Sequence, residues 1–447
     1  MSAVIPSHDD PVIAANAEII GGPMGKYSRG NPWWSPLRVI VLLTALGYAV
    51  GYWLDSACRS TSWASPERYE HLCYTDIHPF FSLKGLFEGI FPYLGDAKPE
   101  HMVDAPVLVG LFMEFSARIT SVMNGIWPSD DQAVQFYDVT AVLLFLVLLI
   151  LVITTVNTVS NRPWDAAMIA LAPMMVLAAT ISWDLIALAF VALAFWTQSK
   201  RKNVATGIFL GLALCSASYP IAVVIAVAVI GLRSDDWNRI ANLIGVTALT
   251  WFVINLPFAI ANYDGWVVIY RHQIETGAEL GSVWFALIQL GGPTLSTPLL
   301  NAASVLVFLA AVAVVAAITV RALTTPRLAQ VAFLLVAAFA LTAKGFAPQF
   351  SLWLIPLAVL ARPRWRDFLI WQACEVTYFI AVWWFLAGYN VEGAKGLTPQ
   401  WYAVAIFVHI AGTLYFAYRV IQDINKPEAD VVRKTTRDQV LHQSVML

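Results

Sequence analysis

Long apolar runs without a single charge constrain this chain more than any other feature of its sequence. The run over residues 141–156, AVLLFLVLLILVITTV, is apolar on every side of a helix. Of the 447 residues, 59% are hydrophobic and 13% charged, whereas soluble domains have about 45–50% and about 25%. Strands of a membrane β-barrel would instead alternate apolar and polar residues. Because a helix satisfies its own backbone in lipid, the sequence predicts a polytopic all-α membrane protein.

Twelve apolar segments are expected to cross the membrane. Three of them are shorter than the roughly 20 residues of a full crossing, and we expect them to be tilted or bent around a cavity. These three are 204–218, 220–232 and 348–361. The other nine are 36–54, 134–158, 164–181, 183–199, 238–260, 298–322, 328–344, 368–388 and 400–420.

The basic residues predict the orientation. With the N-terminus in the cytoplasm, most of the 27 Lys and Arg residues lie in cytoplasmic segments, as the positive-inside rule requires. This holds only if the apolar segment 105–126 does not cross, so we predict an interfacial helix there, beginning at Pro106. Residues 1–30 are predicted to be a disordered cytoplasmic tail and 422–447 a second cytoplasmic tail. The transmembrane domain then spans 31–421, with its first outer loop and interfacial helices at 55–126.

The first outer loop is too long to be a simple connection between helices. It includes the segments 73-CYTDIHPFF-81 and 88-EGIFPYLGD-96, whose aromatic residues argue against disorder. Cys58 and Cys73 both lie in this loop, on the oxidising side of the membrane. A disulfide between them is one interpretation, and two free thiols are the other, because spacing does not determine geometry.

Asp76 is the acid that stands out in this loop. It lies between Tyr74 and His78, where the chain approaches the membrane. A carboxylate beside a medium of low polarity holds its proton more tightly, which suits a general base. The alternative is an ordinary aspartate that caps the following helix. Asp76, Asp104 and Glu114 could gather a metal ion, but no spacing demands one, and the sequence predicts no cofactor and no zinc site.

Several cations and one further acid are expected on the same outer side. Arg271 and His272 could bind a phosphate, or could instead extend toward the membrane surface beside neighbouring aromatic residues. Lys344, in 341-LTAKGFAPQF-350, lies at the end of an apolar segment, where a charge usually has a function. Trp183 and Asp184 open another span. Cations and acids at the level of lipid headgroups suit chemistry on a lipid phosphate.

Taken in order, several segments resemble the GT-C glycosyltransferases, and among them the actinobacterial glycosyltransferase family 87. The resemblance covers about residues 36–420. The segments that carry it are 74-YTDIHPFF-81, 88-EGIFPYL-94, 104-DAPVLVGLFME-114, 182-SWDLIAL-188, 255-NLPFAIANYDGW-266, 277-GAELGSVW-284, 344-KGFAPQFSLWLIPLAVL-360 and 362-RPRWRDFLIWQ-372. Family members often have an aromatic residue where this chain has Ala105, and a lysine where it has Ala217.

The resemblance implies an inverting transferase at the outer face of the plasma membrane. Asp76 would be the catalytic base, and a polyprenyl-phosphate sugar, by the family pattern mannose, would be the donor. The acceptor would be an envelope glycolipid or glycan. The phosphate ligands would be Lys344, Arg271, His272 and His78, and the sugar and acceptor pocket would include Asp104, Trp183, Asp184, Gln349 and Tyr74.

Other functions remain open at this point. An arabinofuranosyltransferase with a decaprenyl-phosphate donor is the nearest enzymatic alternative. A flippase or transporter for a polyprenyl-linked sugar, or a non-catalytic scaffold, would belong to another class. All of these would have membrane lipids as partners, and the net charge of −2 gives no reason to expect a nucleic-acid partner.

Overall fold

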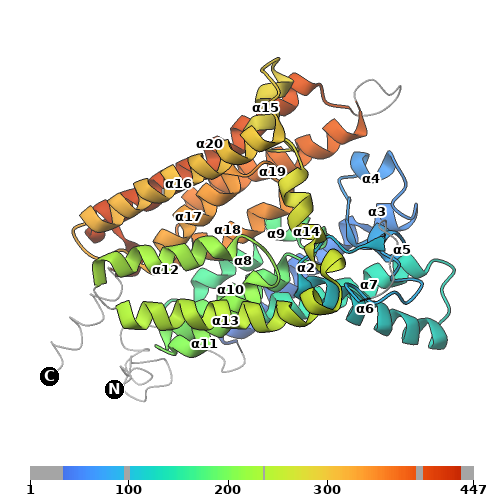
Figure 1. The fold of residues 1–447 in the computed structure, drawn as a ribbon, viewed down its shortest axis with the longest axis horizontal. Helices are drawn as coiled ribbons and strands as arrows, with labels where there is room; N and C mark the ends of the chain where they lie inside the picture. The colour runs from blue at the N-terminus through green and yellow to red at the C-terminus, as the bar shows by residue number, and fades with distance from the viewer. Residues whose placement is uncertain (1–33, 95–100, 235–236, 389–395, 434–447) are drawn as a thin grey trace, which may run out of the picture.

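The computed structural model describes residues 34–94, 101–234, 237–388 and 396–433, and all regular structure in these ranges is helical (Figure 1). Seven helices are long and apolar enough to cross a membrane. They are α2 (Pro36–Leu54), α6 (Val107–Ile126), α7 (Gln132–Thr158), α13 (Trp237–Ala261), α16 (Thr297–Arg321), α19 (Trp365–Ala387) and α20 (Pro399–Asn425). The predicted all-α membrane class is therefore confirmed.

Five shorter apolar helices of 11 to 15 residues complete the bundle. They are α10 (Leu185–Ser199), α11 (Asn203–Leu214), α12 (Pro220–Ser234), α17 (Leu328–Thr342) and α18 (Ser351–Ala361). Every residue of α18 is buried. Because a full crossing needs about 20 residues, these helices stop partway. At the ends of α18, Ser351 and Arg362 are buried, whereas Lys200, Arg201 and Lys202, between α10 and α11, are exposed.

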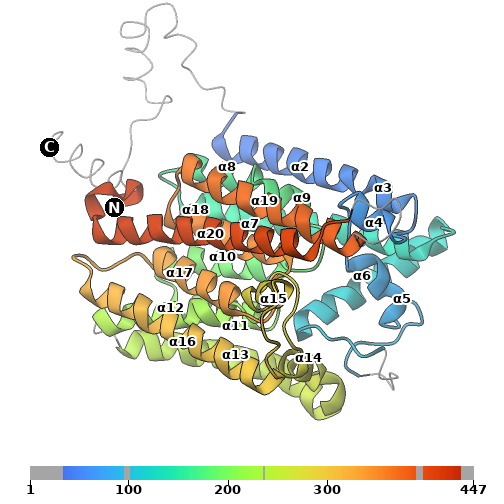
Figure 2. The ribbon, with the colours of Figure 1, turned by 90° about the horizontal axis from the view of Figure 1, so that it is seen from above.

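The bundle has two ends that differ in structure. The short helices α3 (Ser56–Arg59), α4 (Glu67–Glu70) and α5 (Ile77–Leu83) lie together with α6 at one end, which we call the loop end (Figure 2). At the opposite end, the terminal end, α2 begins and α20 finishes. Between the two ends, α16, α17 and α20 form one layer and α11 and α13 another, with α12 between them (Figure 1).

The segment 164–181, predicted as one membrane span, is not a single helix. It is divided into η3 (Pro163–Ala166), α8 (Ala167–Ala170) and α9 (Pro173–Ala178). Proline lacks the backbone N–H that would continue a helix, and Pro173 begins a new helix for that reason. α2 packs closely against this broken segment at Gly51. A Cβ atom added at Gly51 would lie 2.2 Å from the carbonyl oxygen of Val176, so there is no room for a larger side chain.

The helix α6 occupies the segment for which we predicted no crossing. Its length and composition would allow a crossing, but both ribbon views place it with α3 to α5 at the loop end. Glu114 and Arg118 form an ion pair on this helix, with 2.6 Å between Arg118 Nε and Glu114 Oε1. That α6 lies in the interface stays a prediction.

Charged side chains at the terminal end are buried in pairs. Arg362, 2% exposed, binds Asp367 at 2.7 Å and also binds Asp423. Arg327 Nε lies 2.9 Å from Asp430 Oδ2, and its other nitrogens donate to the last carbonyl oxygens of α18. These pairs join α17, α18, α19 and α20. Residues 422–433 therefore pack against the bundle, whereas the predicted tail at 1–30 and residues 434–447 lie outside the described residues.

Candidate functional site at the loop end

Two segments far apart in the sequence are joined by hydrogen bonds at the loop end. The backbone N–H of Asp76 donates to the carbonyl oxygen of Ile181 at 2.8 Å. The hydroxyl of Thr75 donates to the carbonyl oxygen of Thr180 at 2.7 Å. These bonds place Asp76 beside the start of α10, where Asp184 lies. Two acids that the sequence singled out separately are therefore neighbours.

Asp76 has the environment of a general base. Burial raises the pKa of Asp76 to about 6, against the effect of the Tyr74 hydroxyl, which donates to Asp76 Oδ1 at 2.7 Å. The negative charges of Asp184 and Asp104 raise this pKa further. Asp76 stands at the start of α5, but its side chain makes no capping hydrogen bond. As a residue, Asp76 is half-buried.

Asp184 is oriented by neutral donors. Trp353 Nε1 donates to Asp184 Oδ1 at 2.6 Å, and the Ser182 hydroxyl donates to the other carboxylate oxygen. Burial raises the pKa of Asp184 as well. Asp184 stands at the N-terminus of α10, but its side chain makes no capping hydrogen bond there. The buried Tyr219 stacks on Trp353 with 4.6 Å between ring centroids.

Lys84 pairs with Asp104, one of these acids, and was not among the residues that the sequence singled out. Its Nζ lies 2.7 Å from Asp104 Oδ1 and 5.2 Å from the centre of the Phe80 ring. Phe80 in turn packs on Trp183, with 5.6 Å between ring centroids. Asp76, Phe80 and Lys84 follow one another at intervals of four residues. Because such residues share one face of a helix, this spacing was the signal that could have identified Lys84.

Several buried polar atoms near these acids have no hydrogen-bond partner among the residues that the structure describes. They are Trp183 Nε1, Tyr219 OH, Gln349 Oε1 and Trp383 Nε1, each on a side chain less than 10% exposed. Trp383 stacks on Tyr74 with 4.7 Å between ring centroids. Buried polar groups are rarely left unpaired without a reason. A ligand rich in hydroxyl groups could supply the missing partners.

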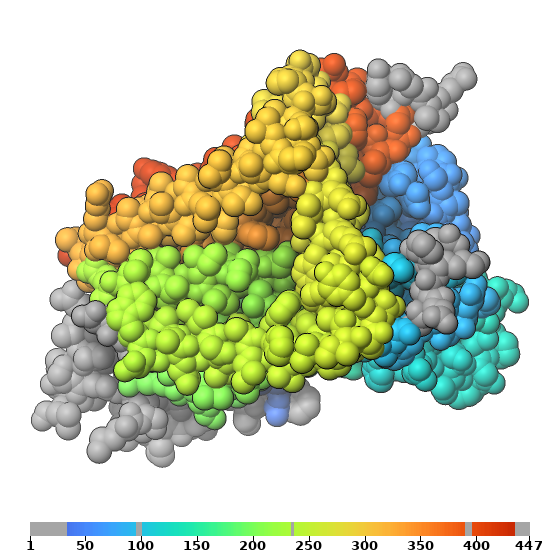
Figure 3. Space-filling view, in the orientation of Figure 1, coloured from blue at the N-terminus to red at the C-terminus, as the bar shows by residue number. Residues whose placement is uncertain are grey.

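The predicted phosphate ligands form a separate group on α14 (Tyr263–Glu275) and the loop after α17. Lys344 Nζ donates to the carbonyl oxygens of Gln273 at 2.5 Å and Thr276 at 2.6 Å. Burial lowers the pKa of Lys344, against the opposing charge of Glu279. Arg271 is exposed and pairs with Asp264 at 3.2 Å, and His272 is exposed on the same helix. Figure 3 shows α14 (yellow) on the surface between the layers of α13 and α16.

His78 lies in another direction from the acids. Its ring stacks on Trp63 with 4.8 Å between centroids, and its Nε2 lies 4.0 Å from Asp131 Oδ1. Burial lowers the pKa of His78, against the effect of Asp131. The structure therefore brings Asp76, Asp184, Asp104, Trp183 and Tyr74 into one region. It does not place His78, Arg271, His272 or Lys344 in hydrogen bonds with them within the described ranges.

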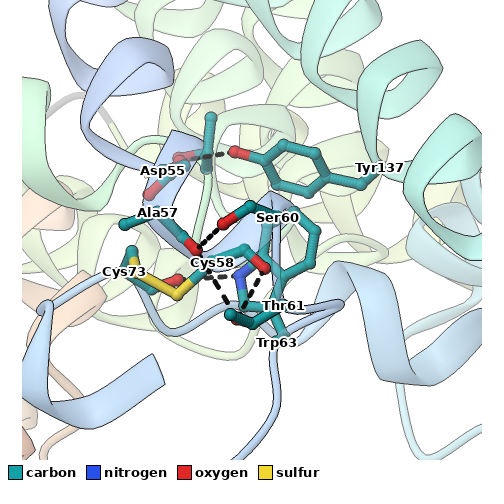
Figure 4. The surroundings of a disulfide bond; sticks show 9 residues. Asp55, Ala57, Cys58, Ser60, Thr61, Trp63, Cys73 and Tyr137 are labelled. Carbon is teal, nitrogen blue, oxygen red and sulfur yellow. Dashed lines mark hydrogen bonds between the residues drawn. A yellow bond between two sulfur atoms is a disulfide. The ribbon is translucent and has the colours of Figure 1, made fainter. Parts of the chain in front are cut away.

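A disulfide bond holds the chain just before Asp76. Cys58 and Cys73 are joined, with 6.0 Å between their Cα atoms (Figure 4). Trp63 Nε1 donates to the carbonyl oxygen of Cys73 at 2.8 Å. Nearby, Asp55 accepts hydrogen bonds from Tyr137 and Thr180. The last of these bonds ties the end of α2 to the same segment that holds the backbone of Asp76.

The described part of the chain contains no group of three or more His, Cys, Asp and Glu side chains that could hold a metal ion. Glu114, one of the acids considered for such a site, is instead paired with Arg118. We call Asp76, Asp184 and Asp104, together with Lys84, the acid cluster.

Neither a protein-family model nor a curated protein matches the sequence. Among solved structures, the chain is similar to ArnT from Cupriavidus metallidurans bound to undecaprenyl phosphate, with 13% identity and a TM-score of 0.39. The alignment covers 86% of this chain and 77% of that chain. This TM-score is too low to establish a shared fold. The fold and the site themselves define an all-helical membrane protein with an acid cluster at one end of its bundle.

Proposed function

We propose that this protein is an inverting glycosyltransferase of the GT-C type, which moves a sugar from a polyprenyl-phosphate donor to a glycolipid or glycan acceptor. The observation that carries the proposal is Asp76: a half-buried aspartate at the loop end, with its pKa raised to about 6 by burial and by the charges of Asp184 and Asp104, the second of which pairs with Lys84. The order of the sequence motifs, which resembles glycosyltransferase family 87, agrees with this function. The distribution of basic residues favours an outer-face site with both termini in the cytoplasm.

The transfer would be a single displacement. Asp76 takes the proton of an acceptor hydroxyl, and the hydroxyl oxygen forms a bond to the anomeric carbon of the sugar. The bond from that carbon to the phosphate oxygen breaks, and polyprenyl phosphate leaves with the electron pair. Placing the acceptor oxygen beside a base and opposite the leaving group inverts the anomeric configuration.

Lys84 is the cation best placed to offset the charge that develops on the leaving phosphate, because it lies within the acid cluster and such charge stabilisation is often the largest catalytic effect. Lys344 would join it by releasing the carbonyl oxygens of Gln273 and Thr276. Arg271, paired with Asp264, and His272 are exposed on α14 and would be further phosphate ligands. His78 is not assigned to the phosphate in this proposal, because it contacts Trp63 and Asp131.

The sugar would occupy the region of the unpaired polar atoms. Trp183 Nε1 and Gln349 Oε1 would bind its hydroxyl groups, and Asp184, Tyr74 and Asp104 would border it. Mannose is the sugar that the family resemblance suggests. A β-linked mannosyl donor would then give an α-mannoside.

The test is a transfer assay in membranes that contain the protein, with labelled polyprenyl-phosphate mannose and a glycolipid extract as acceptor. We expect label to become covalently attached to the glycolipid with the wild type and not with Asp76→Asn. Transfer only from decaprenyl-phosphate arabinose would revise the sugar. Labelled donor that crosses the bilayer unchanged, without covalent transfer, would overturn the proposal in favour of a transporter.

A further inference from the structure

A groove between α6 and α7 lies apart from the acid cluster. Its volume is about 550 Å³. Ile119 and Met123 of α6 form one wall, and apolar residues of α7, including Val139 and Val142, form the other. The polar residues that line it are Arg59, Ser129, Gln135 and Asp138. The groove is therefore apolar along its length and polar at one end.

Exposed tryptophans place this groove at the level of the membrane surface. Trp53 near the end of α2 is 68% exposed, and Trp127, just after α6, is 67% exposed. Tryptophans of this kind gather where lipid headgroups meet the hydrocarbon. Below this level, Val142, Leu146 and Ile150 form an exposed apolar line along α7 at intervals of four residues. The groove thus opens onto the surface that faces lipid chains, with its polar end toward the headgroups.

The polar end carries one cation and one anion close together. Arg59 Nη2 lies 2.5 Å from Asp138 Oδ2, and the Tyr52 hydroxyl donates to Asp138 Oδ1 at 2.7 Å. Arg59 has five N–H donors, and its buried Nε has no hydrogen-bond partner within the described residues. The buried Oε1 of Gln135 also lacks one there. The unused donor belongs to the cation, Arg59, and the unused acceptor lies on Gln135, three residues before the anion Asp138 on α7. This pair fits a headgroup that carries both charges.

We propose that this groove binds one zwitterionic phospholipid of the phosphatidylethanolamine type. One acyl chain would lie between α6 and α7, with the phosphate against Arg59 and the ammonium against Asp138 and Gln135. The neutral sum of Arg59 and Asp138 disfavours an anionic lipid, which would leave the Asp138 carboxylate facing a second negative group. Binding of this lipid does not depend on catalysis, so it can be tested independently of the proposed transfer reaction.

The experiment measures lipid retained by the purified full-length protein. The protein is stripped of lipid in detergent, mixed with phosphatidylethanolamine or phosphatidylglycerol of identical chains, and examined by native mass spectrometry. We expect one phosphatidylethanolamine to be retained per protein, with an affinity about tenfold above that of phosphatidylglycerol. Equal or tighter retention of phosphatidylglycerol would overturn the proposed headgroup contacts.

Two matched variants locate the lipid. Val142→Trp fills the groove, whereas Leu146→Trp adds the same side chain one turn further along α7, outside it. Both positions are exposed, so both variants are expected to fold, and helical circular dichroism checks this. Loss of the retained lipid in Val142→Trp alone supports the site. Equal retention by the two variants, or displacement of the lipid by a prenyl phosphate at equal concentration, would overturn it.

Discussion

The two ends of the bundle differ in how they hold their carboxylates. At the terminal end the carboxylates are bound by arginines, whereas at the loop end two of them are bound only by neutral groups. At the terminal end, Arg362 lies between Asp367 and Asp423, and Asp367 also receives hydrogen bonds from Tyr415 and Arg419. At the loop end, the carboxylates of Asp76 and Asp184 are hydrogen-bonded by neutral tyrosine, tryptophan and serine side chains. Both regions keep ionisable groups away from bulk water, but Asp76 and Asp184 form no ion pair within the described residues, whereas Asp367 and Asp423 share Arg362.

The difference separates a structural role from a chemical one. A buried ion pair with its hydrogen bonds satisfied joins helices, and neither partner is free to react. A carboxylate held only by neutral donors and close to other acids keeps a raised pKa and can accept a proton near neutral pH. We therefore expect substitutions at the loop end to change catalysis and those at the terminal end to change stability.

The largest effect is expected from Asp76→Asn. Asparagine keeps the shape and can still accept the Tyr74 hydrogen bond, but it cannot take a proton. Loss of a general base typically costs about 100-fold or more in rate. The measurement is the initial rate of sugar transfer per inserted molecule, with thermal unfolding as the check on folding. A rate within a few fold of the wild type would remove Asp76 as the base.

Arg362→Met should have its effect on stability instead. It leaves Asp423 and Asp367 buried without their shared cation, and such a loss typically costs about 3–5 kcal/mol. Unfolding of the purified protein by denaturant measures the change. The transfer rate per folded molecule should remain near that of the wild type. Unchanged stability would contradict the structural role of the terminal-end pairs.

The pH dependence of transfer provides the third comparison. The reaction needs ionised Asp76, so the rate should fall as the pH drops below its pKa of about 6. In the acid range the fall should approach tenfold per pH unit, as for a single required base. Initial rates between pH 4.5 and 8 measure this. A rate that stays constant down to pH 5 would indicate a base with an ordinary carboxyl pKa.

Substitutions at two residues next to Asp76 should shift the acid limb of the pH profile, the pH range over which the rate falls, in opposite directions and by smaller amounts. Asp184→Asn removes a negative charge that raises the pKa of Asp76, so the limb should move to lower pH. Tyr74→Phe removes a hydrogen bond that lowers the same pKa, so the limb should move to higher pH. Each shift is expected to be about half a unit to one unit. Shifts of the same sign would show that another group controls the profile.

The amino-acid sequence alone determined the helical membrane class and most helix positions, because apolar runs report directly on burial in lipid. The first span, predicted at 36–54, is α2 (Pro36–Leu54). The prediction of one span at 164–181 was wrong. It relied on apolar composition and did not take into account that Pro173 interrupts the helix. The sequence also singled out Asp76, because it lies in the first outer loop between Tyr74 and His78, where the chain approaches the membrane.

Only the tertiary structure decided which polar residues meet. Asp76 is hydrogen-bonded to Ile181, and Trp353 reaches Asp184 from 169 residues away. Lys84 lies beside Asp104, whereas Lys344 is occupied by carbonyl oxygens of α14 and its following residue. Local sequence patterns report whether a residue enters lipid or water. They do not report which loops pack together, because that depends on where the short helices stop and on contacts between segments far apart in the chain.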